Sequence, residues 1–307
     1  MLLGVVLLAT LTPAQRPDRA FPTAVDSPEF TVDGPVVSFD RGHNNAHTLD
    51  RGYLAFARLL RADGYDLRQR SEPYTPESLA GTELLVVVNA DGGTNPKLLG
   101  FNLPALRRGV RGSPAFGEHE VRALRDWVGE GGSLLLIADH APFGTAAAGL
   151  AAALGVTMHG GFAELASADP GQSDPGNIDF TVENGRLARH AIVEGRGEVE
   201  RIRRVRGFTG QSLDGPPGSE LLLLPAGTLE RIPRTREELA TAPPDPPAGR
   251  AQAVAFELGK GRVVVCGEAA MLTAQIDDRG ERFGMNVAGL DNRQFVLNVM
   301  HWLSRRI

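Results

Sequence analysis

Cysteine is almost absent from the 307-residue chain, because Cys266 is the only one. The chain can therefore form neither an internal disulfide bond nor a cysteine-rich zinc site. Lysine is also scarce: Lys97 and Lys260 are the two lysines among 32 basic residues. The formal net charge of -5 gives no overall positive field, and no aromatic residues are interleaved with the arginines of residues 201–206. We therefore expect no nucleic-acid partner.

Long hydrophobic runs are missing too. The apolar stretch at residues 2–11 is too short to cross a bilayer, which needs about 20 residues. The small residues Thr12, Pro13 and Ala14 follow it and suit signal peptidase, so residues 1–14 are predicted to be a signal peptide, although no lysine or arginine precedes the run. A buried N-terminal strand or helix is the alternative. With the signal removed, we expect an extracytoplasmic (periplasmic or secreted) protein that is not integral to a membrane.

A mostly parallel sheet is predicted after an N-terminal arm at residues 15–33, because short apolar runs then alternate with amphipathic stretches. Buried strands are predicted at residues 36–39, 66–69, 84–88, 133–138 and 262–266, and helices at residues 48–62, 118–130, 145–154 and 292–305. Weaker strand signals stand at residues 178–182 and 199–205, which we expect to be antiparallel or peripheral, and further strands are predicted at residues 221–224 and 251–256. Residues 34–307 are thus predicted to form one α/β domain with a doubly wound sheet, helices on both faces and a flexible proline-rich loop at residues 233–250.

Polar residues stand where the apolar strands end. Ligands bind beyond the carboxyl ends of the strands of such sheets. Acidic, amide or imidazole groups occupy those places after four different strands: Asp40, His43, Asn44 and Asn45; Asn89 and Asp91; Asp139 and His140; and Glu268. If these strands are parallel neighbours, their polar groups converge on one site, and the long loop at residues 92–116 is a candidate lid over it.

Each of these residues also has a structural interpretation. Asp40, Asp139 and Glu268 can cap the turns that follow them, and the two asparagines can adopt turn conformations. The spacing of His43 and His47 would suit a metal site on a helix, but the helix is expected to start after them. His43, His47 and His140 are the candidate metal ligands. Cys266 lies inside an apolar run and is expected to pack in the core.

Four segments together carry a family resemblance: SFDRGHNNAHT, WVGEGGSLLLIADHAPFG, GKGRVVVCGEAAML and LDNRQFVLNVMHWL. They resemble the DUF4350-type members of the class I glutamine amidotransferase-like superfamily, and the last two are also similar to the GIFT-type domains of gliding and intraflagellar-transport proteins. The resemblance covers roughly residues 34–160 and 250–305. It implies a flavodoxin-like, three-layer fold with the Asp139–His140 turn where amidotransferases carry their nucleophile elbow.

The chain departs from that superfamily at the nucleophile. No cysteine stands at residues 138–140, so glutamine amidotransfer is excluded, and no G-x-S-x-G elbow replaces it. Members that lost the cysteine include sugar-related proteins resembling ThuA and pure binding or scaffold domains.

Two functions are therefore expected. One is a hydrolase or lyase for a small polar, carbohydrate-like substrate, in which Asp40, Asp139, His140 and Glu268 are catalytic. It requires no cofactor, although a divalent metal can be accommodated as a variant. In that enzyme His43, Asn44, Asn45, Asn89 and Asp91 would bind the ligand. The alternative is a non-catalytic ligand-binding or assembly domain. The oligomeric state is left open.

Overall fold

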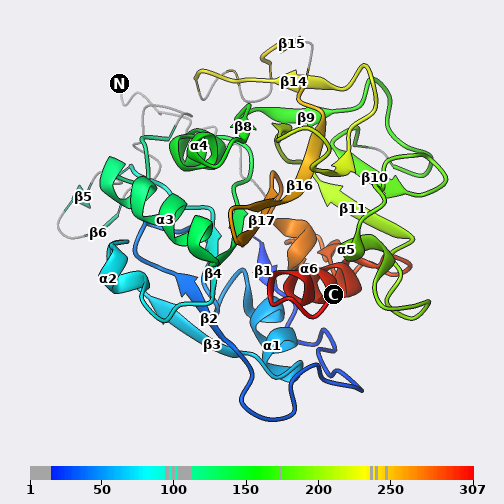
Figure 1. Cartoon of the computed structure of the whole chain (residues 1–307). Helices are drawn as coiled ribbons and strands as arrows, with labels where there is room; N and C mark the ends of the chain where they lie inside the picture. The colour runs from blue at the N-terminus through cyan, green and yellow to red at the C-terminus, as the bar shows by residue number, and fades with distance from the viewer. Residues whose placement is uncertain are drawn as a thin grey trace.

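The computed structural model describes residues 15–93, 97–98, 101–102, 112–172, 174–235, 238, 241–245 and 248–307 (Figure 1). The predicted signal peptide, most of the candidate lid and part of the proline-rich loop lie outside these residues. Within the described part of the chain, no helix combines the length and the hydrophobicity that a membrane span requires.

A nine-stranded sheet forms the centre of the molecule. Its first five strands run parallel, in the order β3 (Asp66–Arg70), β2 (Val36–Asp40), β4 (Leu84–Val88), β7 (Ser133–Ile137) and β17 (Gly261–Cys266). The antiparallel strands β16 (Ala251–Leu258), β12 (Leu213–Asp214) and β8 (Thr157–Met158) continue the sheet, and β13 (Glu220–Leu223) pairs with β16. The parallel strands therefore end side by side at one edge, as predicted.

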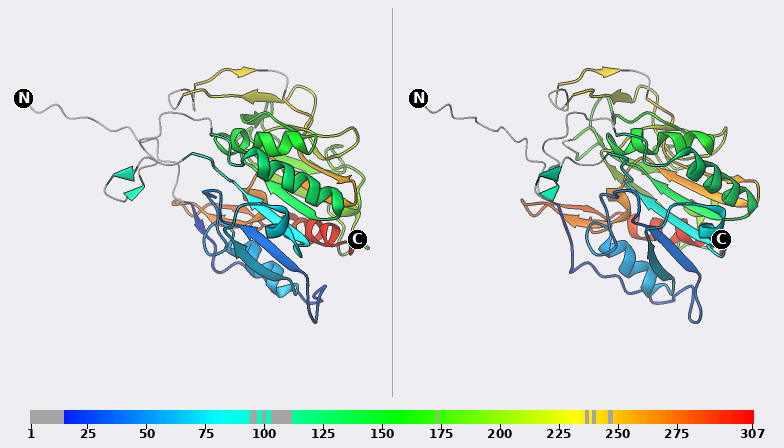
Figure 2. Two further views of the ribbon diagram at one scale, coloured as in Figure 1. Left: turned by 60° about the vertical axis from the view of Figure 1, so that its left-hand side comes forward. Right: turned by 90° about the vertical axis from the view of Figure 1, so that its left-hand side faces the viewer.

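Helices cover both faces of the sheet. On β4, Val86 and Val88 pack with α1 (Leu54–Ala62) and α6 (Asn292–Leu303), whereas Leu85 and Val87 pack with α3 (Glu118–Glu130) and α4 (Phe143–Ala153). Alternate residues of a strand point to opposite faces, so an all-apolar strand requires a helix layer on each side. Figure 2 shows the sheet between these layers. The predicted α/β fold, three-layered and flavodoxin-like, is confirmed.

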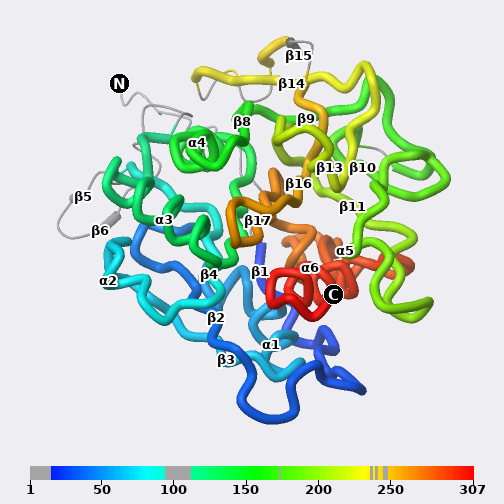
Figure 3. Tube along the Cα trace, in the orientation of Figure 1, coloured from blue at the N-terminus to red at the C-terminus, as the bar shows by residue number. Residues whose placement is uncertain are grey.

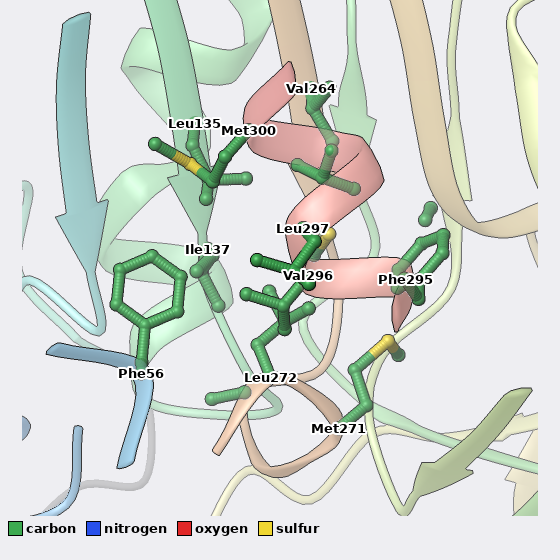
Figure 4. Close-up of a cluster of buried hydrophobic side chains, with 14 of the residues drawn as sticks. Phe56, Leu135, Ile137, Val264, Met271, Leu272, Phe295, Val296, Leu297 and Met300 are labelled. Atoms are coloured by element: carbon green, nitrogen blue, oxygen red, sulfur yellow. The ribbon is translucent and has the colours of Figure 1, made fainter. Parts of the chain in front are cut away.

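The core on the α1 and α6 side is a continuous cluster of apolar side chains (Figure 4). Phe56 of α1, Ile137 of β7 and Leu272 of the 3-10 helix η3 (Ala270–Leu272) meet the inner face of α6 there. Phe56 and Leu272 are fully buried, and each such side chain contributes about 1.5–3 kcal/mol of transfer free energy. Cys266 is also fully buried, as predicted, and burial raises the pKa of its thiol, so it is an inert core residue.

Smaller sheets surround the central one. They are β10 (Asn177–Thr181) with β11 (Arg204–Phe208); β9 (Phe162–Glu164), β14 (Leu229–Arg231) and β15 (Pro244–Asp245); β1 (Arg16–Pro17), β18 (Ala274–Ile276) and β19 (Arg282–Gly284); and β5 (Lys97–Leu98) with β6 (Phe101–Asn102). Two short helices, α2 (Pro76–Leu79) and α5 (Ala191–Glu194), complete the structure. The β10–β11 pair is antiparallel, as expected for these two segments.

Several predicted boundaries are displaced by one or two residues, and two are wrong by more. The helix predicted at residues 48–62 begins at Leu54, because Arg51 and Tyr53 donate backbone hydrogen bonds to Thr48 in a separate turn. The strand predicted at residues 199–205 is β11, which begins at Arg204. The chain before it forms a turn, in which the N–H groups of Glu200 and Arg201 donate to the Gly197 carbonyl.

The N-terminal arm, residues 15–33, is bound along the molecule rather than free. Its strand β1 pairs with β18, and the ring of Phe30 packs edge-on against Tyr65 with centroids 4.9 Å apart. The Glu29 carboxylate pairs with Arg196 at 2.6 Å and with Arg306 at 2.7 Å. The arm thus lies beside the C-terminal residues, as the tube in Figure 3 shows.

Candidate functional site

The turn between β7 and α4 carries Asp139 and His140. The Asp139 carboxylate accepts the backbone N–H of His140 at 2.8 Å, and the Asp139 carbonyl accepts the N–H of Gly144 at 2.9 Å. The chain therefore reverses directly from strand to helix, which is the elbow that the sequence predicts. Both side chains keep some access to solvent: 15% of Asp139 and 32% of His140 is exposed.

Glu268, just after β17, lies beside Asp139 and is fully buried. Its carboxylate oxygens accept the N–H groups of Ala270 and Met271, both at 2.6 Å. Burial raises the pKa of Glu268 well above its usual value, and the charge of Asp139 raises it further. Burial likewise raises the pKa of Asp139 to about 7, although backbone N–H groups stabilise its ionised form. Two neighbouring carboxyls that are largely removed from water favour a state in which they hold one proton between them.

His140 is held as a neutral imidazole. Its Nδ1 lies 2.9 Å from the carbonyl oxygen of Ala141, which only accepts, so Nδ1 carries the proton and donates. Nε2 is then a free base, 3.9 Å from Asp139 Oδ1. Burial lowers the pKa of His140, and the ring stacks on Phe162 with centroids 4.2 Å apart. Phe162 also packs against Arg231, whose guanidinium lies 5.5 Å from the ring centroid.

A second polar cluster lies at the end of β2. His43 Nδ1 is 2.9 and 3.0 Å from the two oxygens of Asp40, and Nε2 is 3.0 Å from Glu120 Oε1. Because carboxylates accept, both ring nitrogens donate, which requires the imidazolium form. Burial alone would lower the pKa of His43, but the hydrogen bonds and charges of Asp40 and Glu120 raise it. The ring also stacks on Tyr74 at 4.9 Å, so His43 is a buried link between β2 and α3.

The asparagines join these loops to one another. Asn45 donates to Asp40 Oδ2 at 2.9 Å, and Asn44 donates to the Asp91 carbonyl at 3.1 Å. Asn89 accepts the backbone N–H of Asp139 at 2.9 Å through its side chain, so it connects the two clusters. The structure therefore brings the predicted residues of four strand ends to one edge, as two adjoining groups. Most of them are buried in mutual hydrogen bonds, and the catalytic and ligand-binding roles stay predictions.

The candidate metal ligands are not assembled into a metal site. Both nitrogens of His43 are hydrogen-bonded to carboxylates. His47 lies in the connection that precedes the turn at Thr48, and burial lowers its pKa to about 4. Among the residues that the structure describes, no group of three or more His, Cys, Asp or Glu side chains is arranged to hold a metal ion.

Several residues of this edge could not be predicted from the sequence. Gln211 is fully buried; its Nε2 donates to the Ala138 carbonyl at 2.7 Å, and its Oε1 accepts the N–H of Gly160 at 2.7 Å. Thr209 has a φ of 64°, a rare conformation for a β-branched residue. Gly210 admits no side chain, since a Cβ there would lie 2.4 Å from the Gly267 carbonyl oxygen. The Thr209–Gly210 pair follows a weak strand signal and predicts a turn, but it does not predict the close approach of Gly210 to Gly267.

Three surface hollows formed by described residues, of 630, 390 and 330 Å³, contain none of the predicted site residues. The access that the structure shows at the candidate site is therefore the partial exposure of Asp139 and His140.

Comparisons with known proteins identify a similar fold and no more. No family model and no curated protein match the chain. The mmIFT52 N-terminal domain has a TM-score of 0.59 at 14% identity, over 87% of this chain and 97% of that domain. The cytoplasmic protein STM3548 from Salmonella typhimurium (TM-score 0.48, 13% identity, 88% and 98% coverage) and a ThuA-like protein from Bacteroides uniformis (0.41, 11%, 92% and 94%) are more distant. ThuA-like proteins belong to the class I glutamine amidotransferase-like superfamily, so the neighbours include members of it. The narrower DUF4350 and GIFT assignments stay predictions. What the comparisons establish for this chain is its fold.

Proposed function

We propose that the chain is an enzyme whose Asp139–His140 turn performs acid–base chemistry on a small polar, carbohydrate-like substrate, as a hydrolase or a lyase. The observation that carries the proposal is that one turn holds an imidazole and a carboxyl side by side, both partly open to solvent, with His140 Nε2 3.9 Å from Asp139 Oδ1. Burial lowers the pKa of His140, which favours a neutral ring that can accept a proton at Nε2, and burial raises the pKa of Asp139 to about 7, which favours a carboxyl that can give one. Titratable groups whose environments bring their pKa values near the working pH are suited to general acid–base catalysis.

In the hydrolytic form, His140 Nε2 takes a proton from water as the water oxygen bonds to the reacting carbon. Asp139 gives its proton to the leaving oxygen as the scissile bond breaks. Glu268 acts on Asp139 alone, because its own carboxylate is enclosed by backbone N–H groups. The scheme uses protein side chains and no cofactor. In the lyase form the same base removes a proton from carbon and the same acid protonates the departing oxygen.

Backbone strain supports a functional site at this edge. Three non-glycine residues with positive φ lie there: Asn44 at 50°, Asn89 at 45° and Thr209 at 64°. Such conformations cost free energy and concentrate where a protein holds groups in place for chemistry.

The test is turnover of a panel of chromogenic glycosides and acylated sugars by the wild-type protein and by His140→Ala and Asp139→Asn. Each substitution should lower turnover at least about 100-fold, the usual contribution of a general acid or base. His119→Ala, which changes a histidine on the surface of α3, is the matched control. Unchanged turnover in His140→Ala would reject the catalytic role.

A non-catalytic binding or assembly domain is the second candidate. It is favoured by the burial of Asp40, Asn89 and Glu268, each at most 1% exposed and hydrogen-bonded to neighbouring groups of the protein. A wild-type protein that turns over no panel member, yet melts at a higher temperature with one of the sugars, would support this function over the enzyme.

A further inference from the structure

Hydrogen bonding alone restrains the imidazole of His140 only weakly. Among the described residues, the hydrogen bond of its ring runs from Nδ1 to the carbonyl of Ala141, the next residue in the chain. The ring is partly exposed, so water competes for both of these groups. A general base must present its free nitrogen in a fixed direction, because a small displacement of a reacting group is costly. The orientation of Nε2 therefore depends on a second contact.

Phe162 makes that contact. Its ring stacks on the imidazole of His140 with centroids 4.2 Å apart and ring planes 21° from parallel. A flat contact between two rings restricts their tilt and rotation, and it adds to the free energy gained from burial alone. Phe162 is only partly buried and lies outside the two apolar cores of the protein. Core packing therefore does not explain its position, whereas the contact with His140 does.

The strands β9 and β14 restrain the ring of Phe162 in turn. Arg231 of β14 lies directly opposite Phe162 in the antiparallel register, and its guanidinium is 5.5 Å from the ring centroid. Glu164 lies two residues along β9, on the same face as Phe162, and pairs with Arg231. The ion pair thus lies beside the ring and limits its movement away from His140.

One chain segment anchors both this small sheet and the turn that carries His140. The carbonyl of Gly210 accepts the N–H of Ala163 in β9 at 2.7 Å. The next residue, Gln211, donates from Nε2 to the Ala138 carbonyl at the end of β7, also at 2.7 Å. The two stacked rings are therefore carried by elements that are joined through short hydrogen bonds, which fixes the distance between them.

We infer that Phe162 is a positioning residue for the candidate base: its ring holds the imidazole of His140 so that Nδ1 stays on the Ala141 carbonyl and Nε2 stays available for proton transfer. The catalytic meaning of this inference rests on the proposed function, whereas the orientation of the imidazole can be measured without a substrate. The charged groups next to the stack, Asp139 and Arg231, are retained when Phe162 is replaced, so a change in His140 then reports the loss of the ring.

Nitrogen NMR of the histidine rings tests the inference, because it reports which ring nitrogen carries the proton. The chain has seven histidines, and the signals of His140 are those missing from His140→Ala. Phe162→Leu and Phe162→Met remove the ring but keep an apolar side chain, whereas Phe162→Tyr keeps an aromatic face. Phe283→Leu, at a partly buried phenylalanine of β19, is the matched control. We expect one tautomer, protonated on Nδ1, in the wild type, Phe162→Tyr and the control, and a mixture of both tautomers in Phe162→Leu and Phe162→Met.

The titration of His140 gives a second readout. Burial lowers its pKa, and loss of the ring admits water, so in Phe162→Leu the pKa should rise toward its ordinary value of 6.5. With a substrate from the panel, kcat should fall about tenfold while KM changes less than about twofold, and the acid limb of the pH profile should move to higher pH. Phe162→Tyr should keep the wild-type values.

An unchanged tautomer and an unchanged titration of His140 in both Phe162→Leu and Phe162→Met would overturn the inference. Unchanged turnover in a variant that shows the tautomer mixture would overturn it as well. If the wild type turns over no panel member, the proposed function fails by itself, because the NMR comparison still decides whether Phe162 orients the imidazole.

Discussion

Asp139→Asn should change how the stability of the protein depends on pH. In the native protein, burial raises the pKa of Asp139 to about 7, whereas an unfolded chain holds the same carboxyl near its model value of 3.8. Between these two values the native state binds more protons than the unfolded state. The free energy of unfolding therefore falls as pH rises through this window, and the full contribution of the protonated carboxyl is present only below it.

The size of the effect follows from the shift. A displacement of about three pKa units corresponds to about 4 kcal/mol, spread over the interval from about pH 4 to about pH 7. Asparagine keeps an acceptor for the His140 N–H and adds a donor that can face Glu268, but it does not titrate. The variant should thus match the wild type in acid and exceed it above neutrality by up to about 4 kcal/mol.

Urea unfolding of both proteins at about pH 5 and about pH 8 measures this difference. Titrating groups other than Glu268 affect both proteins alike and cancel in the comparison. The substitution also removes the Asp139 charge that raises the pKa of Glu268, so the measured difference belongs to this pair of carboxyls. Asp278→Asn, which removes a carboxylate from an exposed turn, is the control and should show no pH-dependent gain. A difference between Asp139→Asn and the wild type that is the same at both pH values would refute the reasoning, because Asp139 would then titrate alike in both states.

Three further substitutions test the polar edge. His43→Leu leaves Asp40 and Glu120 without their shared cation and should cost about 3 kcal/mol near pH 6. Because the pKa of His43 is raised, its contribution is lost as pH rises, so a cost in urea unfolding that grows toward alkaline pH would contradict this account. Gln211→Leu removes the side-chain partners of the Ala138 carbonyl and the Gly160 N–H and should lower the urea midpoint by an amount equivalent to about 3 kcal/mol; a neutral substitution would show that water replaces the amide. Thr209→Asn should raise stability by about 1 kcal/mol in thermal unfolding, because asparagine tolerates a φ of 64° better, and a loss would mean that the threonine side chain contributes more than its strain costs.

The central fold was readable from the sequence because its strands are buried on both faces. Runs such as residues 84–88 and 133–137 are uniformly apolar, and the amphipathic period of residues 118–130 matches α3 residue for residue. Short strands such as β9 and β14 carry no such signal. They have three residues each, and their pairing is set by the long-range contacts of the chain rather than by local pattern.

The position of the candidate site could be predicted from the sequence, whereas most of its contacts could not. Parallel strands bring their carboxyl ends together, so the meeting of Asp139 and Glu268 followed from the order of the strands. The contact between His43 and Glu120 did not follow from the order of the strands. Glu120 is the third residue of the helix α3, where an acidic residue is expected to cap the helix rather than to bind a distant histidine. Glu120 does cap, accepting the N–H of Gly117 at 3.0 Å, and its second oxygen makes the contact with His43.

The N-terminal arm has a consequence for local unfolding. Glu29 and Phe30 both contact Arg306, through an ion pair and a cation–π contact at 5.2 Å, and Asp63 joins the Glu29 backbone to His301 of α6. Detaching the arm would therefore remove the partners of Arg306, just beyond the end of α6, and one hydrogen bond to the Asp63 carboxylate that also holds His301. Amide protons of both segments should exchange together, as one cooperative unit assembled from opposite ends of the polypeptide.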